Sequence, residues 1–150
     1  MTDVLLYWRD YRKNAEHPIW CWDTNSRFLS KLKLGDRLWF VTSGSNLRME
    51  PGNAAFLVAV WPVQEVIDNP GDNPSYPPER LRYRIIPDVG ELLTFHDPVM
   101  VDQIVRPIGH NRKVPIGKLL RAPRGLNEEK VRLLRTASGP QMALQWLTGK

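Results

Sequence analysis

Two apolar runs without any alternation constrain the fold of this 150-residue chain most strongly. Residues 38–41 read Leu-Trp-Phe-Val, and residues 54–61 read Ala-Ala-Phe-Leu-Val-Ala-Val-Trp. A strand that is apolar at every position is covered on both faces, as in a closed barrel or beneath a helix. We therefore predict two buried strands, with Trp39 and Trp61 in the core. Pro62 should bend or end the second strand, because proline has no N–H to donate to a neighbouring strand.

The remaining patterns predict short strands, helices and loops around these two strands. One short helix should follow residues 23–25, each of which is a possible N-cap, and a longer one should follow Asn127, which precedes two glutamates. A last short helix should carry Met142 and Trp146, which are four residues apart. Further strands are predicted at residues 4–8, 80–85 and 99–105, and loops at residues 9–18 (with or without a helical turn) and 68–78. We assign the chain to one α+β domain spanning residues 1–150.

Composition places the chain among ordinary globular proteins. Hydrophobic residues make up 42% and charged residues 25%, which argues against wholesale disorder. Cys21 is the single cysteine and cannot form an internal disulfide, so we predict a reducing compartment and a cytoplasmic location. No apolar stretch approaches the roughly 18 residues that a membrane span needs. The histidines and Cys21 lack metal-type spacing, and no phosphate loop or nucleophile motif occurs, so we predict no metal, no cofactor and no catalytic residue.

Basic residues are unevenly distributed along the chain, whose net charge is +5. Between Arg106 and Arg135, nine lysines and arginines face only two acidic residues. Such a concentration attracts polyanions, although a solvated basic face on an ordinary fold would have the same composition. Three arginines alternate along the strand predicted at residues 80–85 and should share one exposed face, either to meet a polyanion or to keep the strand soluble. The candidate phosphate-binding residues are Arg80, Arg82, Arg84, Arg112, Lys113, Arg121 and Arg124.

An aromatic segment before the first predicted helix could supply a pocket for a nucleobase. Such a pocket needs a π-face, hydrogen-bonding groups for the base edge and cations nearby. Trp20 and Trp22 occupy alternate positions, so an extended chain points them the same way. The alternative interpretation places these tryptophans in the core and makes Asp23 a helix cap. The candidate base-pocket residues are Trp20, Trp22, Asp23, Asn25, Ser43 and Asn46.

Four further features follow one another along the chain. They are a Trp-Asp step before a short helix, a Gly-Asp turn into an aromatic strand that ends at a serine, a valine-rich strand after a glycine, and a Leu-Leu-Arg-Ala-Pro-Arg-Gly-Leu segment before an acidic helix start. They lie at residues 22–23, 34–43, 52–66 and 119–126. In this order they resemble the PUA-like superfamily, in particular its EVE branch and more loosely its ASCH and YTH branches. The resemblance spans most of the chain.

The resemblance implies a small mixed β-barrel with short flanking helices. It also implies a pocket beside the barrel that holds one nucleobase, sometimes a modified one, and the base-pocket candidates would converge there. The implied partner is DNA or RNA, and such readers are often joined to an effector, here a nuclease or a modification enzyme. We therefore expect a nucleic-acid-binding module rather than an enzyme.

The alternative is an ASCH-like enzyme that acts on RNA or on a modified nucleoside. Some ASCH-branch proteins use a lysine, a threonine and a glutamate in the pocket. The residues that the resemblance then implies are Thr24 or Thr42, Lys31 or Lys33, and Glu65. Nothing in their spacing demands that arrangement.

Overall fold

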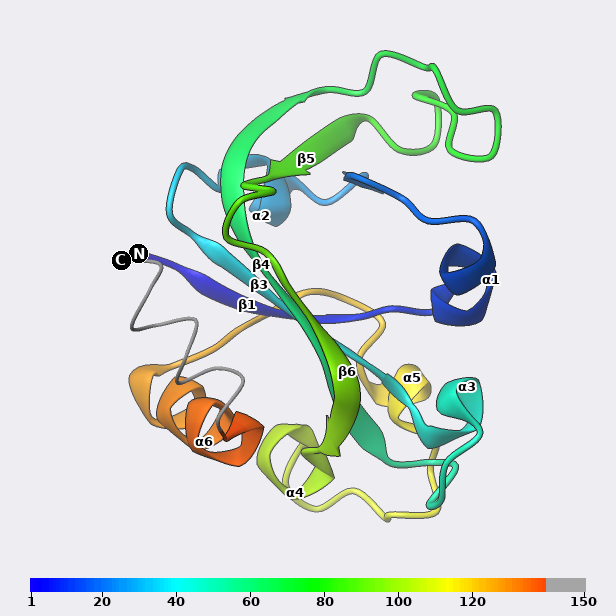
Figure 1. Ribbon diagram of the computed structural model, residues 1–150, viewed down its shortest axis with the longest axis vertical. Helices are drawn as coiled ribbons and strands as arrows, with labels where there is room; N and C mark the ends of the chain where they lie inside the picture. Colours follow the sequence, from blue (N-terminus) through cyan, green and yellow to red (C-terminus); the bar gives the residue numbers. More distant parts are fainter. Residues whose placement is uncertain (140–150) are drawn as a thin grey trace.

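The computed structural model describes residues 1–139, and the last helix predicted around Met142 and Trp146 lies outside them. The described chain is a mixed α/β structure built on one seven-stranded sheet with short helices around it (Figure 1). The strands are β1 (Asp3–Tyr7), β2 (Trp22–Thr24), β3 (Arg37–Ser43), β4 (Ala55–Asp68), β5 (Tyr83–Pro87), β6 (Leu93–Met100) and β7 (Arg124–Gly125). The helices are α1 (Tyr11–Glu16), α2 (Arg27–Ser30), α3 (Gly44–Leu47), α4 (Asp102–Val105), α5 (Ile116–Leu119) and α6 (Glu128–Ser138).

The sheet is organised by β4, which changes its partners along its length. The strand order is β2-β5-β4-β3-β1-β7, and β6 pairs with the first half of β4 while β5 pairs with the second half. β1 runs parallel to β3, whereas the other pairs are antiparallel. Within residues 1–139 no pairing joins β2 to β7, so the sheet is not closed. The mixed class of the prediction is thus confirmed, and closure into a barrel is not.

The two apolar runs form β3 and β4, and both are covered on both faces as predicted. All seven residues of β3 are buried, and β4 is buried from Ala55 to Trp61. Trp39 packs with residues of α4, α5 and α6 on one face, and Trp61 packs with residues around α2 on the other. Pro62 pairs with Arg37 without ending the strand, which continues to Asp68 and is strongly curved (Figure 1).

Three local predictions need correction. The strand predicted at residues 80–85 begins only at Tyr83, so its first residues belong to the loop 69–82. The segment 99–105 is the end of β6 followed by α4 rather than one strand. The short helix α2 is capped by the hydroxyl of Ser26, which accepts from the backbone N–H of Leu29, rather than by a residue of 23–25.

The C-terminal helix and the N-terminal strand form where the sequence predicts them. Asn127 caps α6, because its side-chain oxygen accepts from the backbone N–H of Lys130 at 2.8 Å. β1 covers residues 3–7, and the turn of helix allowed between residues 9 and 18 is α1. None of the helices in residues 1–139 is long and apolar enough to cross a membrane.

Candidate functional site

A pocket of about 1090 Å³ lies where several segments that are distant in sequence meet. Its walls come from the end of β1, α1, the segment that leads into β2 and β2 itself, the start of α3, Asn53, the loop 69–82, Arg84 of β5 and the segment 115–123. Ligand pockets in proteins commonly measure about 300–1,000 Å³. The pocket is therefore large enough for a nucleobase together with its sugar and phosphate.

The structure brings five of the six predicted base-pocket residues to this pocket. Trp20, Trp22, Asp23, Ser43 and Asn46 all line it. Asn25 does not line the pocket and is exposed before α2, so the structure does not bring it together with the other five.

The two tryptophans of the pocket have different surroundings. Trp22 is half-buried, and its ring contacts Trp8 and Phe40 at centroid distances of 5.7 and 4.8 Å, so it belongs partly to the aromatic core. Trp20 is 56% exposed, and its ring centroid lies 5.2 Å from the central carbon of the Arg84 guanidinium. Trp20 is thus an exposed aromatic side chain of the pocket, and a cation–π contact with a buried group holds one face of its ring in place.

Arg84 is buried, which contradicts the prediction that it shares an exposed face with Arg80 and Arg82. Only 1% of the residue is exposed. In the pairing of β2 with β5 it stands opposite Asp23, and its Nε and Nη2 donate to the two carboxylate oxygens of Asp23 at 2.7 and 3.1 Å. A cross-strand pair of opposite charges satisfies the guanidinium inside the fold, so the arginine does not need solvent.

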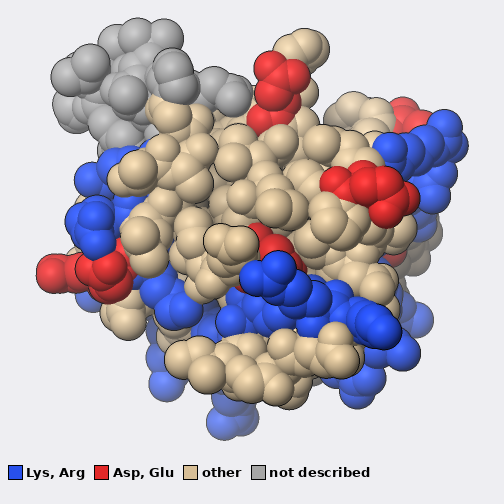
Figure 2. Space-filling view, turned by 90° about the horizontal axis from the view of Figure 1, so that it is seen from below, with Lys and Arg blue, Asp and Glu red and all other residues tan. Residues whose placement is uncertain are grey.

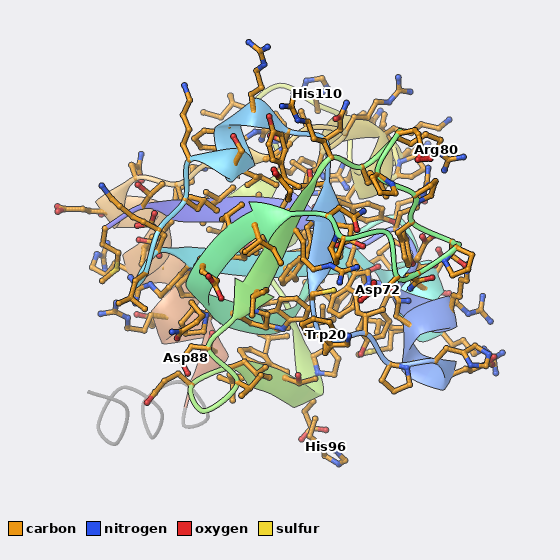
Figure 3. The ribbon with its side chains drawn as sticks, turned by 90° about the horizontal axis from the view of Figure 1, so that it is seen from above. Trp20, Asp72, Arg80, Asp88, His96 and His110 are labelled. Carbon is orange, nitrogen blue, oxygen red and sulfur yellow. The ribbon has the colours of Figure 1, made fainter. Side chains whose placement is uncertain are left out.

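A second carboxylate also contacts Arg84. Asp72, from the loop 69–82, accepts from Nη2 at 2.8 Å and from Nη1 at 3.1 Å. These hydrogen bonds hold the pKa of Asp72 below its usual value, while the hydrogen bonds that Arg84 donates to Asp23 and then to Asp72 raise the pKa of Arg84. Figure 3 shows Asp72 and Trp20 close together, with Arg80 and His110 well away from them.

Asp23 has a structural task that sequence reasoning did not anticipate. Its side chain is 4% exposed and both oxygens bind Arg84, so it positions the arginine and is not open to read a base edge. The thiol of Cys21 lies 3.8 Å from the same carboxylate. Burial, and then the negative charge of Asp23, raise the pKa of Cys21 to about 11, so the thiol stays protonated at neutral pH and is a poor nucleophile.

A polar wall of the pocket is formed around Asn46. Its Nδ2 donates to Thr42 Oγ1 at 2.9 Å and to Tyr7 Oη at 3.4 Å. Ser43 caps α3, since its hydroxyl accepts from the backbone N–H of Asn46. A Cβ on Gly117 would lie 2.7 Å from the ring of Tyr7, so only glycine allows this close approach. The side chain of Asn46 is therefore held at a fixed place in the pocket.

The predicted phosphate-binding residues are dispersed. Arg121 is exposed and lines the pocket together with Arg9 and Lys118, which the sequence analysis had not selected. Arg124 is half-buried and lines a second pocket of about 320 Å³. Exposed positions outside the pocket are held by Arg80, Arg82, Arg112 and Lys113. Viewed from below, lysines and arginines form a band across the lower half of the molecule (Figure 2).

The residues of the alternative, enzymatic interpretation do not come together. Thr24 lines the pocket, but Lys31, Lys33 and Glu65 are exposed outside it. Thr42 is fully buried, and its hydroxyl donates to the carbonyl of Trp8. The structure therefore does not place these residues together in the pocket. No group of three or more His, Cys, Asp or Glu side chains in residues 1–139 could hold a metal ion.

No protein-family model matches this chain, and no curated protein is a match for it.

Several pocket residues were missed by sequence reasoning, above all those of the loop 69–82. Asp72 and Tyr76 line the pocket from this loop, and Tyr76 accepts a 3.5 Å hydrogen bond from Asn14 of α1. The available signal was the length of the loop, because connections of more than about 12–15 residues are uncommon and usually functional. The contact with α1, 62 residues away in sequence, has no sequence signature.

Proposed function

We propose that this protein binds nucleic acid by taking one nucleobase into the pocket described above. The observation that carries the proposal is the exposed residue Trp20, whose ring is held against Arg84 in a pocket of sufficient size. Base stacking on an aromatic side chain contributes about 1–3 kcal/mol and suits every base.

Cations around the pocket support a nucleic-acid ligand. Arg9, Lys118 and Arg121 are exposed and line it, where they can contact the phosphates on either side of a bound base. Asn46 supplies its carboxamide oxygen for the base edge, because its Nδ2 already donates to Thr42 and Tyr7. A nucleobase inside a pocket must leave its stack, so the ligand class we propose is a single strand or a flipped nucleotide.

The fold we propose for this function is a PUA-like β-barrel of the EVE-like type. The order of sequence features resembles that branch. The curvature of β4 (Figure 1) and the pocket beside the sheet are compatible with it. A modified base is the proposed preference, because one added methyl group buried against an aromatic ring is worth about 0.8 kcal/mol. A cationic methylated base would add about 0.5–2 kcal/mol.

The test compares two exposed aromatic residues. Fluorescence anisotropy with short single-stranded oligonucleotides should show that Trp20→Ala weakens binding by about tenfold or more, and that Trp20→Phe restores most of it. Phe28 is the matched control, since it is 43% exposed and does not line the pocket. Equal losses for Trp20→Ala and Phe28→Ala would contradict the proposal.

The same assay addresses the base. Matched oligonucleotides carrying cytosine, 5-methylcytosine, 5-hydroxymethylcytosine, adenine or N6-methyladenine should differ in affinity, in both DNA and RNA versions. Equal affinity for all of them would leave only a basic surface without a base pocket. A preference that survives both Trp20→Ala and Trp22→Ala would mean that the base binds elsewhere.

A further inference from the structure

One buried guanidinium in the pocket contacts two carboxylates. Arg84 is already neutralised by Asp23, whose side chain is 4% exposed and bound through both oxygens. Asp72 adds a second negative charge to the same group although its own side chain is 58% exposed. Burial of one cation therefore does not explain why a second anion from a loop is present.

The contact of Asp72 has the geometry of a bound ligand. Its two oxygens face Nη1 and Nη2 of Arg84 at 3.1 and 2.8 Å, in the two-pronged arrangement that arginine uses for carboxylates and phosphates. The opposite prong, Nε with Nη2, is bound to Asp23. The edge of Arg84 that faces Asp72 is therefore the edge nearer to solvent, and both residues line the pocket.

The loop 69–82 is held by hydrogen bonds that do not involve Asp72. Asn69 is buried at the start of the loop, and its Nδ2 donates to the carbonyls of Tyr76 and Leu81 at 2.9 and 2.8 Å. Its Oδ1 accepts from the backbone N–H of Gly71 at 3.0 Å. The backbone N–H of Asn69 also donates to the carbonyl of Arg82 at 2.8 Å, and its Oδ1 accepts from Arg84 Nη2 at 3.4 Å. Asn69 thus joins the two ends of the loop without a contact to Asp72, and the contact between Asp72 and Arg84 is additional to this closure.

We propose that the Nη1–Nη2 edge of Arg84 is a phosphoryl-binding subsite of the pocket, and that Asp72 occupies it until a ligand phosphate takes its place. This inference rests on the proposed function and names the part of the ligand that Arg84 binds. A phosphoryl group offers the same pair of acceptor oxygens as Asp72. With Trp20 over the guanidinium, the base stacks on the indole and its own or a neighbouring phosphate binds beneath it.

Removal of an internal competitor should increase affinity. If Asp72 fills the subsite in about nine of ten molecules, its loss raises the apparent affinity for a phosphate-bearing ligand about tenfold. The variant is Asp72→Asn, which keeps the shape and removes the charge. The control is Glu79→Gln, an exposed residue of the same loop outside the pocket, which changes the net charge equally.

Four probes separate the sources of the phosphate: a nucleoside, its 5′-monophosphate, a short oligonucleotide and inorganic phosphate alone. Isothermal titration should show a gain with Asp72→Asn, and none with Glu79→Gln, for every probe that carries phosphate. The nucleoside should bind both variants as it binds the wild type. The size of the gain separates the sources: a larger gain for the oligonucleotide than for the monophosphate assigns the subsite to a backbone phosphate, and an equal or larger gain for the monophosphate assigns it to a free nucleotide.

The proposal is overturned if Asp72→Asn binds phosphate-bearing probes no better than Glu79→Gln, or binds them more weakly while remaining folded by circular dichroism. Inorganic phosphate tests the subsite without any base. If Asp72→Asn binds inorganic phosphate more tightly but the nucleoside does not bind at all, the base pocket is refuted and the phosphoryl subsite is supported. If the nucleoside binds but Asp72→Asn gains no affinity for any phosphate-bearing probe, the base pocket is supported and the phosphoryl subsite is refuted.

Discussion

Two buried arginines, Arg84 and Arg106, bind one carboxylate in the same way and differ in the partners of their remaining N–H groups. Each binds one buried carboxylate through Nε and Nη2: Arg84 binds Asp23, and Arg106 binds Asp102 at 2.8 and 3.0 Å. The remaining N–H groups of Arg106 donate to the backbone carbonyls of Asn53, Asn111 and Val114. The corresponding edge of Arg84 meets only side chains, and its charged partner there is Asp72, from an exposed part of a loop.

The difference separates a structural arginine from one at a binding site. Backbone carbonyls cannot leave without unfolding the segments that carry them, so Arg106 ties α4 to the loop before α5 permanently. A solvent-exposed carboxylate on a loop can be replaced by another anion at little cost. The pocket also lies beside Arg84, whereas the smaller pocket near Arg106 is bordered by a guanidinium with all its donors in use.

The largest expected effect is on stability at Arg106. Arg106→Ala should lower the free energy of unfolding by about 3–5 kcal/mol, because Asp102 is left buried without its charged partner. Urea denaturation followed by tryptophan fluorescence measures this loss. The control is Arg132→Ala, which removes an exposed ion pair with Glu129 and should cost less than about 1 kcal/mol. Similar losses for both variants would show that the buried pair has no special role.

Substitution of the two carboxylates, Asp102 beside Arg106 and Asp72 beside Arg84, should also affect stability unequally. Asp102→Asn should destabilise the protein strongly, since Asp102 Oδ1 also accepts from the backbone N–H of Ala55 at 2.9 Å and the side chain is buried. Asp72→Asn should lower the free energy of unfolding far less than Asp102→Asn, because the side chain of Asp72 is 58% exposed. If Asp72→Asn destabilised the protein as much as Asp102→Asn, the loop carboxylate would be structural and the comparison would fail.

A smaller effect is expected on the salt dependence of nucleic-acid binding, which should change for substitutions near Arg84 and not for those near Arg106. Arg121 lines the pocket beside Arg84, whereas Arg112 follows Asn111, one of the residues that hold Arg106, and is exposed outside that pocket. Arg121→Gln should reduce the slope of log affinity against log salt by about 1 for single-stranded oligonucleotides. Arg112→Gln should leave the slope unchanged. The reverse result would place the phosphates on the side of Arg106.

The smallest effect concerns pH, through Cys21 beside the Arg84 cluster. Its pKa is raised from 9.0 to about 11, first by burial and then by Asp23, so the unfolded chain ionises before the native one. This thiol therefore contributes stability that is complete below about pH 9 and is lost as the pH rises towards about 11. Between these values the urea midpoint of wild type should fall more steeply than that of Cys21→Ala. Tyr11→Phe controls for the pKa of Tyr11, which burial also raises; equal slopes for wild type and Cys21→Ala would exclude the effect.

Sequence reasoning worked where the signal was local. The runs that became β3 and β4 are apolar at every position, and Asn127 precedes acidic residues in the first helical turn, so each pattern reports on its own element. That Trp20 and Asn46 line the same pocket was expected only from the resemblance to the PUA-like superfamily, which rests on the order of several sequence features.

Sequence reasoning was wrong where the position of a side chain depended on contacts with residues distant in sequence. The alternation of Arg80, Arg82 and Arg84 is a local pattern, yet the burial of Arg84 is decided by Asp23, 61 positions away, and by Asp72, 12 positions away. Neither contact leaves a periodic trace in the sequence. The sequence likewise carries no signal that Asn25 is exposed before α2 and does not line the pocket.

The walls of the pocket run from Leu6 to Pro123, so nearly the whole described chain must be folded before the pocket exists. Any molecule that fits it therefore binds the native state and not the unfolded one. At a hundred times its dissociation constant, such a ligand stabilises the fold by about 2.7 kcal/mol. Differential scanning fluorimetry against a library of nucleosides, nucleotides and short oligonucleotides can consequently identify the ligand by a rise in melting temperature.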